Sequence, residues 1–383
     1  MSGYYFDHAA TTPMHPEVLE AMIAVMQDGP ANASSIHQYG RKAKQRLNQS
    51  RDLIAKHLGC KPNEFIFTSG GTESDNLAIF GAARVQAQLN RKHLITSAIE
   101  HHAVLHAMEW LQKNEGFELT VLPVDEYGFI SLEALQNELR PDTALVSIMH
   151  ANNEVGSIQP IYQIGNMVHE AGALLHVDAV QTLGHITYNL QEMPIDFASF
   201  SAHKIYGPQG IGGLYVAPKV SVESLIHGGK QERKRRAGTE NIAAIVGFAK
   251  ALDISVNNRH IQQPYLEALR NRWVKLLSQA LGPDQMVING DLSRSLPHIV
   301  NISFLGFDTE TLLMNFDMSG IAVSSGSACT SGSLERSHVL QAMRISHERL
   351  NSAVRFSFGM GNTMDELEAA AEIVVSILQR LRS

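Results

Sequence analysis

Short apolar runs alternate with longer helix-like stretches through the middle of the sequence, and this alternation constrains the fold more than any other feature. The runs that read as strands are residues 64–68, 93–97, 119–122, 144–149, 173–177, 196–200 and 212–216. Helical stretches lie between them, at residues 74–90, 102–114, 131–139 and 160–171. Strands separated by helices form mostly parallel sheets that are covered on both faces. The sequence therefore predicts an α/β fold around a mostly parallel, seven-stranded sheet.

The flanks of this pattern predict further elements. A short strand and turn are expected within residues 4–13, helices at 16–26 and 41–58, and more than one helix near 241–280. Strands at 298–305, 321–324 and 354–359, with a helix at 308–317, predict a second, α+β region. Thr363 and Glu366 are spaced as a capping box that starts a C-terminal helix.

Glycines and polar side chains follow several of the predicted strands at the point where each strand ends. They are Gly71 and Thr72, His101, Asn153, Asp178, and the group Ser201, His203 and Lys204. The carboxyl ends of parallel strands meet at one edge of a sheet, and ligands of α/β proteins bind outside that edge. We therefore expect these residues to gather in one binding site.

Lys204 is unusual because no other Lys, Arg, Asp or Glu occurs between Asp196 and Lys219. Loss of hydration lowers the pKa of a lysine and makes its amine nucleophilic. A lysine with a packed stem and a hydrated tip would fit this stretch equally well. Asp178 favours the first interpretation, because a carboxylate at the end of an apolar strand needs a partner. A lysine, together with an aspartate facing a pyridinium nitrogen, is typical of pyridoxal phosphate (PLP) sites.

The motifs HVDAVQ, SAHKIYGPQGIG, TSGGTESDN and SSGSAC together resemble the NifS/IscS-type cysteine desulfurases, in the class V aminotransferase-like group of PLP enzymes. The similarity runs from FDHAATTP near the N-terminus to VRFSFG near the C-terminus. It implies PLP fold type I and a homodimer. It also implies a large PLP-binding domain over residues 15–255 and a small α+β domain made of residues 1–14 and 256–383. Gln209 and Lys230 depart from the family pattern without touching the residues assigned below.

The resemblance implies roles for the residues at the sheet edge. Lys204 would hold PLP and move the α-proton of the substrate, and Asp178 would keep the ring nitrogen protonated. His101 would stack on the ring, with His102 as the alternative. The other implied PLP ligands are Gly71, Thr72, Ser201 and His203 at the phosphate, Thr239 from the neighbouring subunit, and the polar residues Asn153 and Gln181.

Asn153 and Arg355 are the residues that the resemblance implies for substrate binding. The planar guanidinium of Arg355 suits an α-carboxylate, although a structural salt bridge is the other interpretation. Cys329 stands where the family has its sulfur acceptor, whereas Cys60 is expected to be an inert thiol.

The implied reaction takes sulfur from L-cysteine, leaves L-alanine, and holds the sulfur as a persulfide on Cys329. An acceptor protein, either an iron–sulfur scaffold or a tRNA-thiolating enzyme, would then receive it. Selenocysteine lyase or another class V PLP enzyme is the alternative activity. A catalytically silent scaffold would tolerate the loss of Lys204, Asp178, His101 and Cys329, so the presence of all four argues against it.

Composition excludes several other classes. A formal net charge of −7 argues against direct nucleic-acid binding, and the basic run at residues 230–236 is typical of a solvated face. No apolar run approaches the ~20 residues of a membrane span, and no signal peptide is evident. Two cysteines make no disulfide framework, and no residue spacing resembles a zinc site. We therefore expect a cytoplasmic protein without membrane or metal binding.

Overall fold

The computed structural model describes residues 3–30, 32–326 and 336–382. Its main sheet has, within those residues, the strand order β2-β8-β7-β6-β5-β3-β4. The strands are β2 (Phe65–Thr68), β3 (His93–Ser97), β4 (Glu118–Leu122), β5 (Thr143–Ser147), β6 (Leu174–Asp178), β7 (Phe197–Ser201) and β8 (Gly212–Val216). Neighbours from β7 to β4 are parallel, whereas β8 is antiparallel to both β7 and β2. The predicted seven-stranded, mostly parallel sheet is confirmed.

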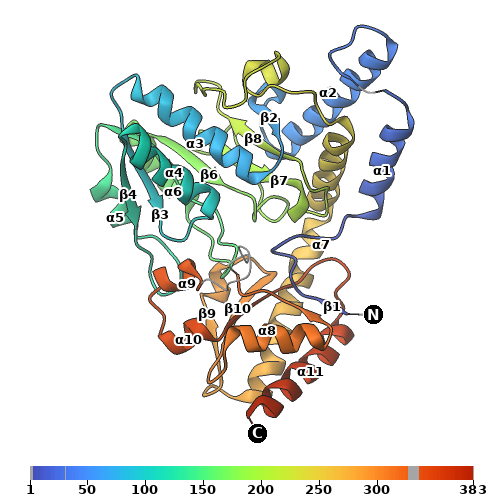
Figure 1. Ribbon diagram of the computed structural model, residues 1–383, viewed down its shortest axis with the longest axis vertical. Coiled ribbons are helices and arrows are strands. Elements are labelled where there is room, and N and C mark those ends of the chain that lie inside the picture. The colour runs from blue at the N-terminus through green and yellow to red at the C-terminus, as the bar shows by residue number, and fades with distance from the viewer. Residues whose placement is uncertain (1–2, 31, 327–335, 383) are drawn as a thin grey trace.

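Helices cover both faces of this sheet, because successive strand side chains point to opposite sides. α3 (Gly71–Ala87) and α4 (His102–Glu115) pack on the face where Leu94 and Leu145 are buried. The next residues, Ile95 and Val146, are buried on the other face. The helices there are α1 (Pro16–Gln27), α2 (Gln38–Leu58), α5 (Leu132–Glu138), α6 (Ile161–Glu170) and the first part of α7 (Ile242–Leu281). Figure 1 shows both layers.

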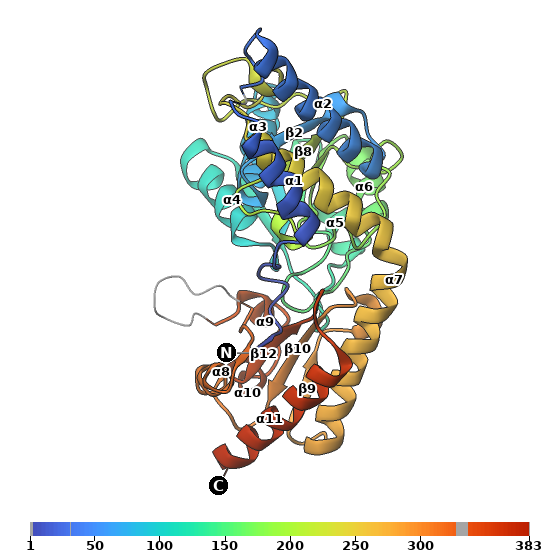
Figure 2. The same cartoon turned by 90° about the vertical axis from the view of Figure 1, so that its right-hand side faces the viewer.

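The expectation of more than one helix near residues 241–280 is wrong, because α7 is a single helix of 40 residues. Its first part packs in the core beneath the main sheet, and its second part, around Trp273, packs in a separate core. Pro264 lies inside the helix, where it removes one backbone donor. Since each part is held by its own core, the helix continues through the proline. Figure 2 shows α7 running past both regions.

The second region contains two small sheets. One is antiparallel, with the order β12-β10-β9, and consists of β9 (Met286–Asn289), β10 (Ile299–Phe304) and β12 (Ala353–Ser357). The other pairs β1 (Tyr4–Tyr5) in parallel with β11 (Ile321–Ala322). The helices of this region are α8 (Thr309–Met318), α9 (His338–Ala342), α10 (His347–Asn351) and α11 (Met364–Arg382). The predicted capping box at Thr363 and Glu366 is confirmed by reciprocal hydrogen bonds of 3.2 and 3.1 Å.

Candidate active site

A cavity of about 430 Å³ lies where β5, β6 and β7 end, and Ser324 and Arg355 of the second region also line it. Among the described residues, every residue that the sequence predicted for the site lines this cavity, apart from Thr239. The lining residues among them are Gly71, Thr72, His101, Asn153, Asp178, Gln181, Ser201, His203, Lys204 and Arg355. Thr239 is exposed elsewhere, and Cys329 lies outside the described residues. Most of the residues that were selected because they follow strand ends therefore line one cavity.

Lys204 ends a short 3₁₀ turn, Ala202–Lys204, that directly follows β7. Its Nζ donates hydrogen bonds to the backbone oxygens of Ala9 and Ala10, both at 2.6 Å. Burial, and then the positive charge of Arg355, lowers the pKa of Lys204 from 10.5 to about 7, while Asp7 and Asp178 oppose this shift. A large fraction of this amine is therefore neutral, and nucleophilic, near neutral pH.

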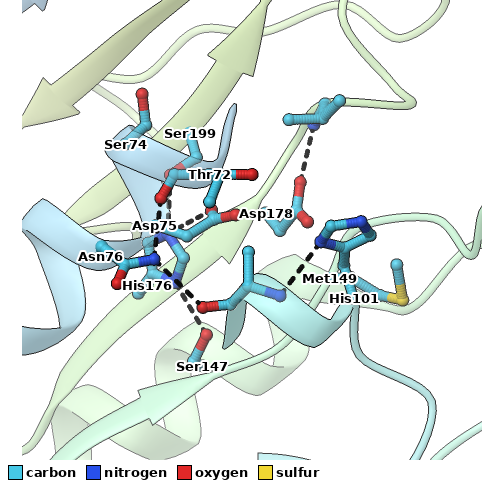
Figure 3. Close-up of polar contacts among 12 residues, drawn as sticks. Thr72, Ser74, Asp75, Asn76, His101, Ser147, Met149, His176, Asp178 and Ser199 are labelled. Carbon is cyan, nitrogen blue, oxygen red and sulfur yellow. Dashed lines mark hydrogen bonds and ion pairs between the residues drawn. The ribbon is translucent and has the colours of Figure 1, made fainter. Parts of the chain in front are cut away.

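Asp178 is the last residue of β6, and its side chain is buried. One carboxylate oxygen accepts a hydrogen bond of 2.9 Å from the backbone N–H of Val180 (Figure 3). Burial raises the pKa of Asp178 to about 6, against the opposing effects of Val180 and Lys204. Among the described residues Asp178 forms no ion pair within 4 Å. A cationic N–H donor in the cavity would satisfy it.

A second buried carboxyl group, that of Asp75 in α3, lies beside Asp178 (Figure 3). Burial, and then the charge of Asp178, raises the pKa of Asp75 well above its usual value. Asp75 Oδ1 lies 3.5 Å from His176 Nε2. The His176 ring bonds to the hydroxyls of Ser147 and Ser199, at 2.7 and 2.9 Å. Because burial lowers the pKa of His176 to about 3, this network supplies no counter-charge to Asp178.

His101 caps the N-terminus of α4, where its Nδ1 accepts a hydrogen bond of 3.1 Å from the N–H of Ala103. Its ring is exposed to the cavity, yet loss of hydration and then the charge of Lys204 lower its pKa to about 4. The ring is therefore neutral, with the proton on Nε2. His102 also lines the cavity, but its ring packs on the rings of His106 and His338, with centroids 4.8 and 4.5 Å apart.

Gly71, Thr72 and Ser201 come together at the N-terminus of α3, where backbone N–H groups favour an anion. A Cβ on Gly71 would lie 2.7 Å from Val180 Cγ2, so a larger residue here would force Val180 to move. His203 is held by its Nδ1, which lies 3.1 Å from Thr11 Oγ1. Burial lowers the pKa of His203 to about 4.

Two residues of the stretch 230–236 form ion pairs with α3 and α2. Arg236 pairs with Glu73 in the first turn of α3, at 2.8 Å. Glu232, within the run, is buried and pairs with Arg51 at 2.6 Å. The expectation of a solvated face holds for Arg233 and Lys234, which are exposed, and is wrong for these two anchored positions.

Arg355 reaches the cavity from β12 with its side chain only 3% exposed. Its guanidinium pairs with Asp7 at 2.7 Å and donates to the backbone oxygen of Asn153 at 2.8 Å. The structural salt bridge is thus present, and its Nε has no partner among the described residues. Gln181 donates through its Nε2 to the backbone oxygen of Ala9, at 2.9 Å.

Four residues with titratable side chains line the cavity but were not identified from the sequence: Asp7, Asp75, Glu154 and His338. Asp75 lies in the polar stretch TESDN, which begins with the selected residue Thr72, and Glu154 lies in NNEVG, next to the selected residue Asn153. A carboxylate so close to a predicted site residue is the signal by which both could have been found. Asp7 and His338 lie on segments far from the sheet in sequence, where no local pattern marks them.

Three further expectations concern the reactivity of Cys60, metal binding and membrane spans. Cys60 is partly buried, and burial raises the pKa of its thiol to about 12, which agrees with an inert cysteine. Those residues contain no group of His, Cys, Asp or Glu side chains arranged to hold a metal ion. No helix in the described part of the chain is long and apolar enough to cross a membrane.

Comparisons with known proteins show which sequences and structures this chain is similar to. The family model for aminotransferase class V matches residues 4–370. Cysteine desulfurase IscS of Dictyoglomus turgidum is 43% identical over 379 residues, covering 99% of this chain and 95% of that protein. A solved NifS-like protein superposes with a TM-score of 0.92 at 38% identity, covering 99% and 100% of the two chains. SspA in complex with cysteine superposes with a TM-score of 0.82 at 36% identity, covering 93% and 98%.

Proposed function

The chain belongs to the class V aminotransferase family, among its cysteine desulfurases, and on that basis we propose that it moves the sulfur of L-cysteine onto Cys329 and releases L-alanine. The observation that carries this proposal is that Lys204, with its lowered pKa, shares one cavity with Asp178, which is buried and forms no ion pair with any described residue. In the overall reaction a thiol and L-cysteine give a persulfide and L-alanine. One S–S bond forms, one C–S bond breaks, and the freed carbon is protonated.

PLP is the cofactor that these residues fit. The Lys204 amine would hold it, the Asp178 carboxylate would accept a hydrogen bond from its ring N–H, and Gly71 keeps Val180, which lines the cavity, from being displaced. Thr72, Ser201 and His203 would bind its phosphate at the N-terminus of α3. His101, neutral and facing the cavity, would cover the ring, with Asn153 and Gln181 at its polar edge. When bound, PLP supplies an electron sink for the bonds at the substrate carbon.

The residues of the chain then have distinct tasks. Arg355 would bind the substrate carboxylate by the donors that Asp7 and Asn153 leave free. The Lys204 amine, once displaced by substrate, would take the α-proton, since its pKa lies near working pH. Neutral His101 can exchange a proton at Nε2. The Cys329 thiolate would attack the substrate sulfur and keep it.

The test compares two cysteine variants of the PLP-loaded enzyme. Cys329→Ala should retain PLP and bind L-cysteine, but should lose the persulfide and nearly all alanine production. Cys60→Ala is the matched control and should behave like the wild type, because the raised pKa of its partly buried thiol leaves little thiolate to react. Alanine is measured by amino-acid analysis, and the persulfide by peptide mass mapping. Normal alanine release from Cys329→Ala would refute the proposal.

We propose that the working enzyme is a homodimer in which Thr239 serves the phosphate of the other subunit. Thr239 is exposed and does not line the cavity of its own chain. Leu19, Ile23 and Met26 form an exposed apolar face of α1, being 48%, 42% and 62% exposed, which supports a contact with a second copy. Mixed dimers of Lys204→Ala and Thr239→Ala chains should regain activity, because one of their two sites is intact. Activity no higher than that of the separate variants would contradict this arrangement.

The remaining parts of the proposal concern organisation and setting. We propose a division into residues 15–255 and residues 1–14 with 256–383, supported by the core around Trp273 and by the pairing of β1 with β11, while Val339 and Leu340 of α9 pack in the core of the main sheet. We infer a cytoplasmic enzyme that passes sulfur to an iron–sulfur scaffold or a tRNA-thiolating enzyme. Capture of proteins that accept labelled sulfur from the persulfide would identify the acceptor.

A further inference from the structure

Glu154 is a buried carboxylate beside the cavity that the reaction described above does not use. Its side chain belongs to the turn after β5 and is only 1% exposed. The backbone of this turn is fixed by Asn152, whose Oδ1 accepts from the N–H groups of Glu154 and Val155 at 2.8 and 3.0 Å. Asn152 is fixed in turn by donating to the backbone oxygen of Ile99. The position of the Glu154 side chain is therefore set by the main sheet.

The carboxylate of Glu154 contacts two residues that are far from it in sequence. Ser337 Oγ donates a hydrogen bond of 2.5 Å to Glu154 Oε2, and the same hydroxyl caps α9 by accepting from the N–H of Leu340 at 3.0 Å. Gly326 packs directly on this carboxylate, because a Cβ there would lie 2.6 Å from Oε2. Gly326 also has a φ of +97°, which favours glycine. Glu154 thus contacts the chain just before and just after residues 327–335.

A buried charge at this place has a cost that a neutral side chain would avoid. Burial raises the pKa of Glu154 to about 7, while the Ser337 hydrogen bond and the charge of Arg355 oppose the shift. The short O–H···O distance is typical of an ionised acceptor, which gives a stronger and more directional bond than a neutral one. The contact therefore fixes the α9 end more firmly than packing alone would.

We propose that Glu154 is a positioning residue, which holds Gly326 and Ser337, the two described positions on either side of residues 327–335, at one point of the cavity wall. This inference rests on the proposed function, because it assumes that Cys329 accepts the sulfur. Glu154 acts through its two contacts and takes no proton or sulfur itself.

The experiment measures cysteine turnover by PLP-loaded Glu154→Ala, Glu154→Gln and Ser337→Ala enzymes. Glu154→Ala should lower kcat by about 10- to 100-fold, the loss expected when a reacting group is misplaced by ~1 Å. KM for L-cysteine and PLP content should stay within about 2-fold, because neither depends on the thiol. Glu154→Gln keeps an oxygen that can accept from Ser337, so it should restore most of kcat.

Ser346→Ala is the matched control for Ser337→Ala. Both serines cap a short helix, but Ser346 caps α10 without contacting Glu154. Ser337→Ala should lower kcat as Glu154→Ala does, and Ser346→Ala should leave it unchanged. The double variant Glu154→Ala/Ser337→Ala should be no slower than either single one, since both remove the same contact.

Three results would overturn the inference: an unchanged kcat in Glu154→Ala, a kcat that falls only in proportion to PLP content, or equal effects of Ser337→Ala and Ser346→Ala. Its failure can be distinguished from failure of the proposed function. If the wild-type enzyme forms no persulfide on Cys329, the proposed function is wrong. If the wild type forms it and Glu154→Ala forms it equally fast, only this inference is wrong.

Discussion

The lowered pKa of Lys204 predicts how the cofactor-free protein captures PLP as pH changes. With a pKa of about 7 in place of 10.5, about nine in ten of the Lys204 amines are neutral at about pH 8, against about one in 300 for an ordinary lysine. Only the neutral amine attacks the PLP aldehyde. The rate of capture should therefore rise about tenfold per pH unit below about 7 and level off above it.

The assay mixes cofactor-free protein with PLP for short times between about pH 5.5 and 9.5, a range that spans the lowered pKa. Borohydride then fixes the attached cofactor, and peptide mass mapping quantifies the label on Lys204. Nα-acetyl-lysine, which keeps its side-chain amine, is treated in the same way and corrects for the titration of PLP itself. A capture rate that keeps rising to the highest pH, as for Nα-acetyl-lysine, would refute the reasoning, and so would label on a different lysine.

Two variants should move the pH at which the capture rate levels off, and they should move it in opposite directions. Arg355 lowers the pKa of Lys204 and Asp7 raises it, and the two pair with each other at 2.7 Å. Arg355→Gln removes the cation and leaves Asp7 without its partner, so the midpoint should shift to higher pH. Asp7→Asn should shift it to lower pH. Shifts of the same sign would show that the charges around the amine are assigned wrongly.

Three further predictions concern the walls and support of the cavity. Gly71→Ala places a methyl group 2.7 Å from Val180 Cγ2, so PLP retention during dialysis should weaken by about 10-fold or more; wild-type retention would contradict the fit. Arg355→Lys loses the planar fork, so steady-state kinetics should show KM for L-cysteine raised about 10- to 100-fold, and an unchanged KM would mean that the carboxylate binds elsewhere. Glu232→Ala leaves Arg51 buried without its partner, so denaturant unfolding should show a loss of about 3–5 kcal/mol, whereas a loss below about 1 kcal/mol would mean that water reaches the site.

The main sheet could be predicted because its signals are local. Each strand is a short apolar run, and the residues after it carry the chemistry, so the strand ends placed Asp178 and Lys204 in one cavity without any knowledge of tertiary contacts. Boundaries shifted by a few residues, as at α3, which begins at Gly71 rather than 74. That difference matters chemically, because it puts Gly71 and Thr72 in the first turn of a helix, where their N–H groups are free for an anion.

The second region was harder to predict because its elements are short or depend on distant partners. β9 has only four residues and exists because it pairs with β10, and α9 and α10 have five residues each. Stretches of that length carry no readable period. In α7 the situation is the opposite: Pro264 is a strong local signal for a break, and packing on both sides of it keeps the helix continuous.

The state of Lys204 depends on parts of the chain that sequence reasoning could not connect to it. Its amine donates to the oxygens of Ala9 and Ala10, 195 and 194 residues away, and its pKa responds to Asp7 and Arg355. These groups come from the N-terminal segment and from β12, whereas Lys204 follows β7 of the main sheet. The motif around Lys204 therefore supplies the amine but not its reactivity. Burial is the larger cause of the lowered pKa and the charge of Arg355 the smaller one, so docking of the second region, which brings Arg355 to the amine, adds to the reactivity of Lys204. A variant that loosens this docking should raise the Lys204 pKa even though it changes no residue of the cavity.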